Sequence, residues 1–155
     1  MLAQMTAMAE AEGIVFDFDR LRHANTRRAH RVLHLAKGRG LQAELMERLF
    51  RAYFAEGEEV ADPDALARLG EEVGLDPDEV RDAIDDDEYE AAVDRDINRA
   101  RMLGANGVPF FLFEQQYAVS GAQPAETFAD LLGRVLELQR AGDAAEESRG
   151  GRATG

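Results

Sequence analysis

The spacing of apolar residues predicts that most of this chain is helical. Apolar side chains recur with helical periodicity from Thr26 to about Gly38 and from Leu41 to about Glu56. In the first of these segments Ala29, Val32, Leu33 and Ala36 form the expected inner face, and Arg27, Arg28 and Arg31 are expected to lie on the solvent side. Both segments are followed by glycine, a residue that commonly ends helices.

Three acidic sites mark the starts of further helices. Asp62-Pro63 and Asp76-Pro77 each place a favoured capping residue before a proline, which is tolerated in the first helical turn. Glu79 follows Asp76 at the spacing of a capping box. Asp85-Asp86-Asp87 precedes a helical pattern that continues to about Leu103. Leu66 and Leu69 are expected to point inward, and Tyr89, Val93, Ile97, Ala100 and Met102 to be available for packing.

The beginning of the chain is less distinct. Leu2, Met5 and Met8 indicate a short helix that ends at Gly13. The next segment, Ile14–Phe18, is rich in β-forming residues and fits either a strand stub or an extended connection.

The periodicity changes after Gly104. Phe110–Phe113 is apolar at every position, as expected for a strand covered on both faces, and Tyr117–Val119 can return as a second strand after a turn at residues 114–116. Pro124 begins a last helix, whose inner face should comprise Phe128, Leu131, Leu132, Val135 and Leu138. From Gly142 onward, small and charged residues indicate a disordered tail.

The small number of strands indicates an incomplete α/β fold. A two-stranded hairpin is marginally stable by itself, and a strand that is apolar on both faces needs neighbours. Only Ile14–Phe18 could add a third strand. We therefore expect that the remaining strands precede Met1, and that the hairpin of this chain could self-associate through exposed edges.

Composition and charge exclude several classes of function. The sequence of 155 residues has a formal net charge of -13, which disfavours binding to nucleic acids or to anionic membranes. It contains no cysteine, so the chain itself can supply neither a thiolate nucleophile nor a cysteine-ligated metal site. The first residues do not resemble a signal peptide, and no apolar run approaches the length of a membrane-spanning helix. The expected location is the cytoplasm.

Metal binding is not predicted. His30 and His34 have a spacing that could place both on one metal ion, but no third ligand is evident, so packing or hydrogen bonding explains them better. The acidic stretch from Asp76 to Asp96 lacks the pattern of a calcium-binding loop. Its carboxylates are better explained as helix caps and as a solvated face.

Four segments together resemble a known family. They are Gly104–Phe113, which includes Gly107-Val108-Pro109, then Tyr117–Pro124, and the helical segments Ala29–Ala36 and Leu49–Phe54. In content and order they are similar to the C-terminal part of DsbA-family oxidoreductases, with the FrnE-like branch as the nearest match, over about residues 1–140.

The resemblance implies a thioredoxin-like α/β fold, of which this chain holds only part. Residues 1–20 would be the connection from a preceding thioredoxin half, 21–103 a helical insertion domain, 104–141 the C-terminal ββα part and 142–155 the tail. The Cys-x-x-Cys motif of such proteins would lie before Met1, so no catalytic residue is expected in this chain. Val108 and Pro109 would form the cis-proline loop that aligns an extended substrate peptide, and Gly121 and Gln123 occupy positions where glutathione-using relatives contact their ligand.

The expected function is therefore that of the C-terminal part of a protein thiol–disulfide oxidoreductase that is inactive alone. Its partner would be a protein or peptide thiol or disulfide, with no cofactor. Two alternatives stay open: a non-catalytic module that binds a peptide or partner, and an activity like that of 2-hydroxychromene-2-carboxylate isomerases, which belong to the same wider family.

Overall fold

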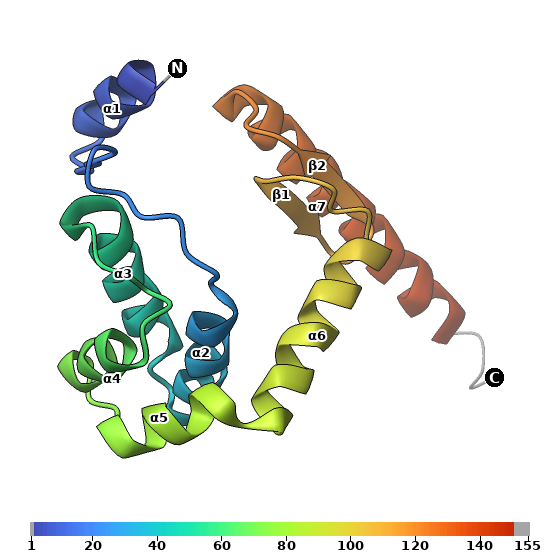
Figure 1. Ribbon diagram of the computed structural model, residues 1–155. Helices are drawn as coiled ribbons and strands as arrows, with labels where there is room; N and C mark the ends of the chain where they lie inside the picture. Colours follow the sequence, from blue (N-terminus) through green and yellow to red (C-terminus); the bar gives the residue numbers. More distant parts are fainter. Residues whose placement is uncertain (1, 151–155) are drawn as a thin grey trace. The chain divides into compact units, whose positions relative to one another are not determined.

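The computed structural model describes residues 2–150, and their side chains as far as residue 141. The chain divides into two units, Met1–Arg99 and Ala100–Gly155, each of which we describe by itself (Figure 1). The division falls inside a helix, close to the boundary that the change of periodicity after Leu103 suggests.

The first unit is helical, as its apolar spacing predicts. Its elements are α1 (Leu2–Ala11), α2 (Arg27–Arg39), α3 (Gln42–Arg51), the π-helical segment η1 (Ala52–Glu56), α4 (Pro63–Glu72), α5 (Pro77–Asp85) and α6 (Asp87–Met102), which continues into the second unit. The segment Ile14–Phe18 forms an extended connection and no strand. The Asp17 N–H donates to the Phe54 carbonyl at 2.7 Å, which ties this connection to the end of η1.

Acidic caps start the three later helices where the sequence predicts them. Asp62 accepts from the Ala65 N–H at 2.9 Å, and Asp76 accepts from the N–H groups of the second and third residues of α5 at 2.8 and 3.2 Å. Asp86 caps α6 in the same way, accepting from the Glu88 N–H at 2.6 Å. These bonds satisfy amide groups that have no partner within a helix. The Glu79 carboxylate bonds to Arg39 of α2 rather than closing a capping box with Asp76.

Helices α2 to α5 enclose the core of the first unit. The largest fully buried side chains are Leu45, Leu66, Leu69, Ile84, Val32 and Val80. Gly70 allows α4 and α5 to approach closely, because a Cβ atom there would lie 2.8 Å from Cγ2 of Val80. On α2 the covered face includes Leu35, which is 6% exposed, whereas Leu33 is only partly buried.

The second unit is a hairpin with a long helix. Strands β1 (Phe110–Phe113) and β2 (Tyr117–Ser120) pair antiparallel, with Phe110 opposite Ser120 and Phe113 opposite Tyr117. Helix α7 (Ala125–Gly150) packs on one face of the hairpin. There the rings of Phe111 and Phe128 pack edge to face, with their centroids 4.8 Å apart.

Cover in this unit is thinner than the sequence pattern predicts. Phe111 is 39% exposed, although its strand was expected to be covered on both faces, and Leu132 and Leu138 of the expected inner face are 45% and 53% exposed. A sheet of two strands is too narrow to cover the full apolar stripe of α7. Met102, expected to pack, is 88% exposed for the same lack of neighbours.

The C-terminal segment also differs from the prediction. Where a disordered tail was expected from Gly142, α7 continues through Gly150, in line with the high helix propensity of residues such as Ala144, Ala145 and Glu146. Residues 151–155 lie outside the described part of the chain. No helix among the described residues is both long and apolar enough to cross a membrane.

Candidate functional site

The hairpin brings the four candidate residues to one end. Pro109 immediately precedes β1 and Gly121 immediately follows β2, so the register that pairs Phe110 with Ser120 places them opposite each other. The Gly121 N–H donates to the Pro109 carbonyl at 2.8 Å and continues the ladder by one bond. Val108 and Gln123 flank this pair, and the four residues form what we call the hairpin-end loops.

Val108 is the most exposed of the large apolar residues that the structure describes. Its side chain is 95% exposed, and the peptide bond between Val108 and Pro109 is cis. Within residues 2–150, neither the N–H nor the carbonyl of Val108 takes part in a hydrogen bond. A free donor and a free acceptor on one exposed residue can pair with the backbone of an extended peptide.

Gly121 and Gln123 shape the second loop. Gly121 has a φ of +83°, a conformation that favours glycine. The Gln123 side chain donates from Nε2 to the Ser120 carbonyl at 3.2 Å, so one end of its amide is occupied in holding the turn. Glutathione contact by these two residues stays a prediction.

The hairpin-end loops contain no group that could perform proton transfer or nucleophilic attack. The segments Gly104–Pro109 and Gly121–Pro124 have no charged, histidine, cysteine or tyrosine residue. What this arrangement can do chemically is bind and orient a chain through backbone hydrogen bonds and apolar contact with Val108.

The two histidines of α2 lie apart from these loops in the sequence and serve different contacts. His34 Nε2 lies 3.1 Å from a carboxylate oxygen of Asp96. His30 is exposed as a whole, but one side of it lines an apolar hollow, and the partial loss of water on that side lowers the pKa of His30, with the charge of His34 adding to the effect. Among the described residues, no three His, Cys, Asp or Glu side chains are placed to hold a metal ion together.

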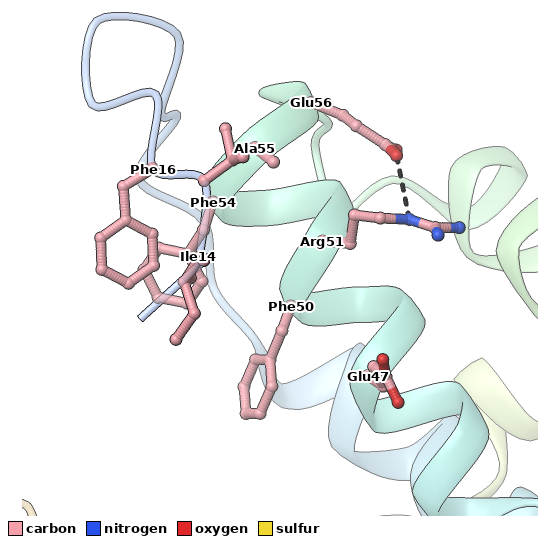
Figure 2. Close-up of a pocket in the computed structure, with 10 residues that line it drawn as sticks. Ile14, Phe16, Glu47, Phe50, Arg51, Phe54, Ala55 and Glu56 are labelled. Carbon is pink, nitrogen blue, oxygen red and sulfur yellow. Dashed lines mark ion pairs between the residues drawn. The ribbon is translucent and has the colours of Figure 1, made fainter. Parts of the chain in front are cut away.

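Sequence reasoning did not single out an apolar hollow of about 520 Å³ in the first unit. The connection Gly13–Phe16 lines one side of it, and Phe50 and Phe54 line the other (Figure 2). The ring centroids of Phe16 and Phe54 are 5.1 Å apart, and Arg51 and Glu56, which also line the hollow, form an ion pair of 3.2 Å. The density of phenylalanine in two separate segments was the available signal, but only the fold shows that they meet.

A family model matches most of the chain. Residues 1–133 match the DSBA-like thioredoxin domain. This chain belongs to the DsbA-like thioredoxin family. The predicted family and the thioredoxin-like fold class are thus confirmed, whereas the FrnE-like branch stays a prediction.

Two similar proteins are longer than the part of them that this chain matches. A crystal structure of a probable DsbA oxidoreductase from Streptomyces coelicolor is similar with a TM-score of 0.81 and 39% sequence identity, over 87% of this chain and 58% of that one. The uncharacterized protein YwbO of Bacillus subtilis (strain 168) is 34% identical over 84 residues, which are 54% of this chain and 42% of YwbO. The DsbA-like chain described here therefore spans less than two thirds of either relative.

Proposed function

We propose that this DsbA-like chain supplies the substrate-aligning part of a protein thiol–disulfide oxidoreductase of the FrnE-like branch, and that the redox-active cysteines are supplied from outside the chain. The observation that carries the proposal is the exposed Val108, whose backbone N–H and carbonyl are unpaired within residues 2–150, in a chain of this family. The absence of cysteine from the sequence supports the second half.

The division of labour follows from the chemistry of exchange. A thiolate attacks one sulfur of a substrate disulfide, a mixed disulfide forms, and the other sulfur leaves as a thiolate. That step requires the substrate to be extended and held near the attacking sulfur. The hairpin-end loops would hold it by accepting and donating main-chain hydrogen bonds at Val108, while Val108 contacts a neighbouring side chain of the substrate.

A titration of the isotope-labelled chain with an extended peptide that carries a disulfide tests the alignment role. We expect NMR shift changes at residues 107–110 and 121–123, and we expect Val108→Asp to abolish them. Val15→Asp is the matched control, because Val15 is also an exposed valine, at 68%, but belongs to the first unit. Shifts confined to other residues, or equal loss in both variants, would contradict the proposal.

An insulin-reduction assay tests the redox half. The chain alone should not accelerate reduction above the rate of the thiol reagent, since it contains no sulfur nucleophile. Reading the DNA before the codon for Met1 for an in-frame Cys-x-x-Cys motif tests where the cysteines come from.

A non-catalytic binding module is the second candidate, and the absence of cysteine is the observation that favours it. A binding module would give the same NMR result, but the chain would not form part of any oxidoreductase. Fusing the chain behind the unmatched portion of the Streptomyces relative distinguishes the two: an aligning module should support disulfide exchange in the fusion that Val108→Asp impairs, whereas a pure binding module should not.

A further inference from the structure

Helix α2 faces α6 with a stripe of cationic side chains. Arg27, Arg31 and His34 share one face of α2 by their spacing. Arg27 contacts two carboxylates of α6: its Nε donates to Glu90 Oε1 at 2.9 Å and its Nη2 to Asp94 Oδ1 at 2.6 Å.

The other two members of the stripe extend the contact along α6. Arg31 Nε donates to the second Glu90 oxygen at 2.5 Å, and His34 meets Asp96 at 3.1 Å. Glu90 therefore receives hydrogen bonds from two guanidinium groups, and these bonds lower the pKa of Glu90, with that from Arg27 contributing most. We call this set the α2–α6 charge cluster; its members are Arg27, Arg31, His34, Glu90, Asp94 and Asp96.

Helix α5 is attached to α2 by different means. Val80, Ala83 and Ile84 of α5 are at most 2% exposed and belong to the core of the first unit. From α6, Ala92 and Val93 are buried at 9% and 4% exposure, and Tyr89 is only partly buried against the core. Charge contacts at Glu90, Asp94 and Asp96 therefore make up a larger share of the attachment of α6 than charge contacts do for α5.

A single non-helical residue connects α5 and α6. Asp86 is the single residue between α5 and α6, and it is extended, with φ -76° and ψ 124°. Arg31 bonds to the helices on both sides of Asp86, because it donates to the Ile84 carbonyl at the end of α5 and to Glu90 in α6. Short non-helical positions of this kind absorb the backbone rotation when one element moves against another.

We propose that the α2–α6 charge cluster is a salt-sensitive latch that holds α6 against α2, and that its release lets α6 turn about Asp86. Helix α6 continues unbroken to Met102, two residues before the segment Gly104–Pro109 that carries the exposed Val108. The latch therefore controls the orientation of the helix that leads into the hairpin-end loops. This inference concerns the chain itself and does not depend on the proposed function.

Pulsed electron paramagnetic resonance on the full chain tests the latch. Because the sequence lacks cysteine, Lys37→Cys and Arg99→Cys introduce the only two sites for nitroxide labels, one on α2 and one on α6. We expect one narrow distance distribution at about 50 mM salt and a distinctly broader one at about 1 M, where screening shortens the range of charge interactions to about 3 Å.

Two variants that remove one charge each make the test specific. Glu90→Gln should give the broad distribution at both salt concentrations. Glu79→Gln is the matched control. Glu79 lies on α5 and pairs with Arg39 of α2, but core packing still holds α5 when this pair is lost, so the variant should behave like the parent. A narrow distribution for Glu90→Gln at low salt, or equal broadening in both variants, would overturn the latch.

Hydrogen exchange provides a second measurement and also checks the fold. In Glu90→Gln the amides from residue 90 to 96 should exchange about tenfold faster than in the parent, while those of α4 keep their protection. Unchanged exchange in residues 90–96 would contradict the proposal, as would equally faster exchange in α4, which would indicate general loss of the fold.

Discussion

The helices of the first unit bury far more of their apolar side chains than the hairpin and helix that follow them. We call residues 27–99 the helical region and residues 100–150 the hairpin region. In the helical region α2 to α5 bury a continuous apolar cluster. Among the described side chains of the hairpin region, those of residues 100–141, Val135 alone is buried, at 5% exposure.

The difference has a backbone origin. A helix pairs most of its own N–H and C=O groups, and Asp62 and Asp76 cap the starts of α4 and α5, so the four short helices need mainly apolar faces to close a core. A strand depends on neighbours for its hydrogen bonds, and each added strand also widens the surface that a helix can cover. The hairpin region has two strands, and it leaves both backbone groups and apolar side chains such as Phe111 available to others.

Binding through backbone hydrogen bonds is to be sought in the hairpin region. In the helical region most residues lie in helices, which pair their backbone groups internally, whereas the hairpin region presents Val108 with both of its backbone groups unpaired within the described residues. Substrate alignment by backbone pairing requires such unfinished structure. Leucine truncation in each region compares the two directly, and changes at Arg48, Asp76 and His30 show which contacts stabilise the helical region.

The largest expected effect is on the helical core. Leu66→Ala removes a fully buried side chain and should lower the free energy of unfolding by about 3 kcal/mol, from lost apolar transfer and the cavity left behind. Leu132→Ala removes the same atoms from a side chain that is 45% exposed in the hairpin region and should cost less than about 1 kcal/mol. Chemical denaturation followed by circular dichroism measures both. Equal losses would show that the hairpin region is as well packed as the helical one.

The next effect concerns a buried cation in the helical region. Arg48 is 9% exposed and donates to Glu72 at 2.5 Å and to Glu56 at 2.8 Å, joining α3, η1 and α4. Arg48→Ala should cost about 2 kcal/mol, less than for a fully buried pair because both carboxylates can regain water.

Arg68→Ala is the control for Arg48→Ala. Arg68 also pairs with Glu72, at 2.9 Å, but its side chain is 47% exposed. The expected cost is below about 1 kcal/mol in the same denaturation experiment. If Arg68→Ala were the more damaging of the two, burial of Arg48 would not be the reason for its contribution.

A smaller effect is expected at a helix cap. Asp76→Ala removes the acceptor for two N–H groups of α5 and should cost about 1 kcal/mol. Asp78→Ala, two residues further on, removes a similar carboxylate whose pair with Arg81 is exposed, and it should cost distinctly less. Thermal unfolding distinguishes the two variants, and equal shifts would argue that charge rather than capping is responsible.

The smallest effect is a dependence on pH that arises in the helical region. Partial loss of water against the apolar hollow lowers the pKa of His30 below its ordinary 6.5, so near and below that pH the unfolded chain binds more protons than the folded one. Stability should therefore fall as the pH decreases through this range, and His30→Gln should flatten the fall. Denaturation midpoints between about pH 7.5 and 5.5 measure it.

Carboxylates add a separate loss at more acidic pH. Hydrogen bonds from Arg48 lower the pKa of Glu72, and those from Arg27 and Arg31 lower that of Glu90. A lowered pKa contributes stability that is present above the ordinary value of 4.5 and disappears as the pH falls through the folded value. If His30→Gln lost as much stability as the parent between about pH 7.5 and 5.5, groups other than His30 would be responsible for the fall in that range.

Local signals in the sequence were enough to predict most of the helices, the three acidic caps and the family. Apolar spacing and the pairs Asp62-Pro63 and Asp76-Pro77 are local signals, because an N-cap bond involves residues at most three positions apart. The run through Val108-Pro109 and the following Gly121 marked the hairpin and the DsbA family in the same way.

The tertiary structure decided which predicted faces are covered and by what. Arg27 and Arg31 were expected on the solvent side of α2, yet they face the carboxylates of α6, because sequence spacing defines a helix face but not its neighbour. Phe16 and Phe54 likewise meet only in the fold. The hairpin illustrates the same limit: the apolar pattern of Phe110–Phe113 predicted a strand, but cover depends on how many strands lie beside it, and that is a property of the assembled sheet rather than of the segment.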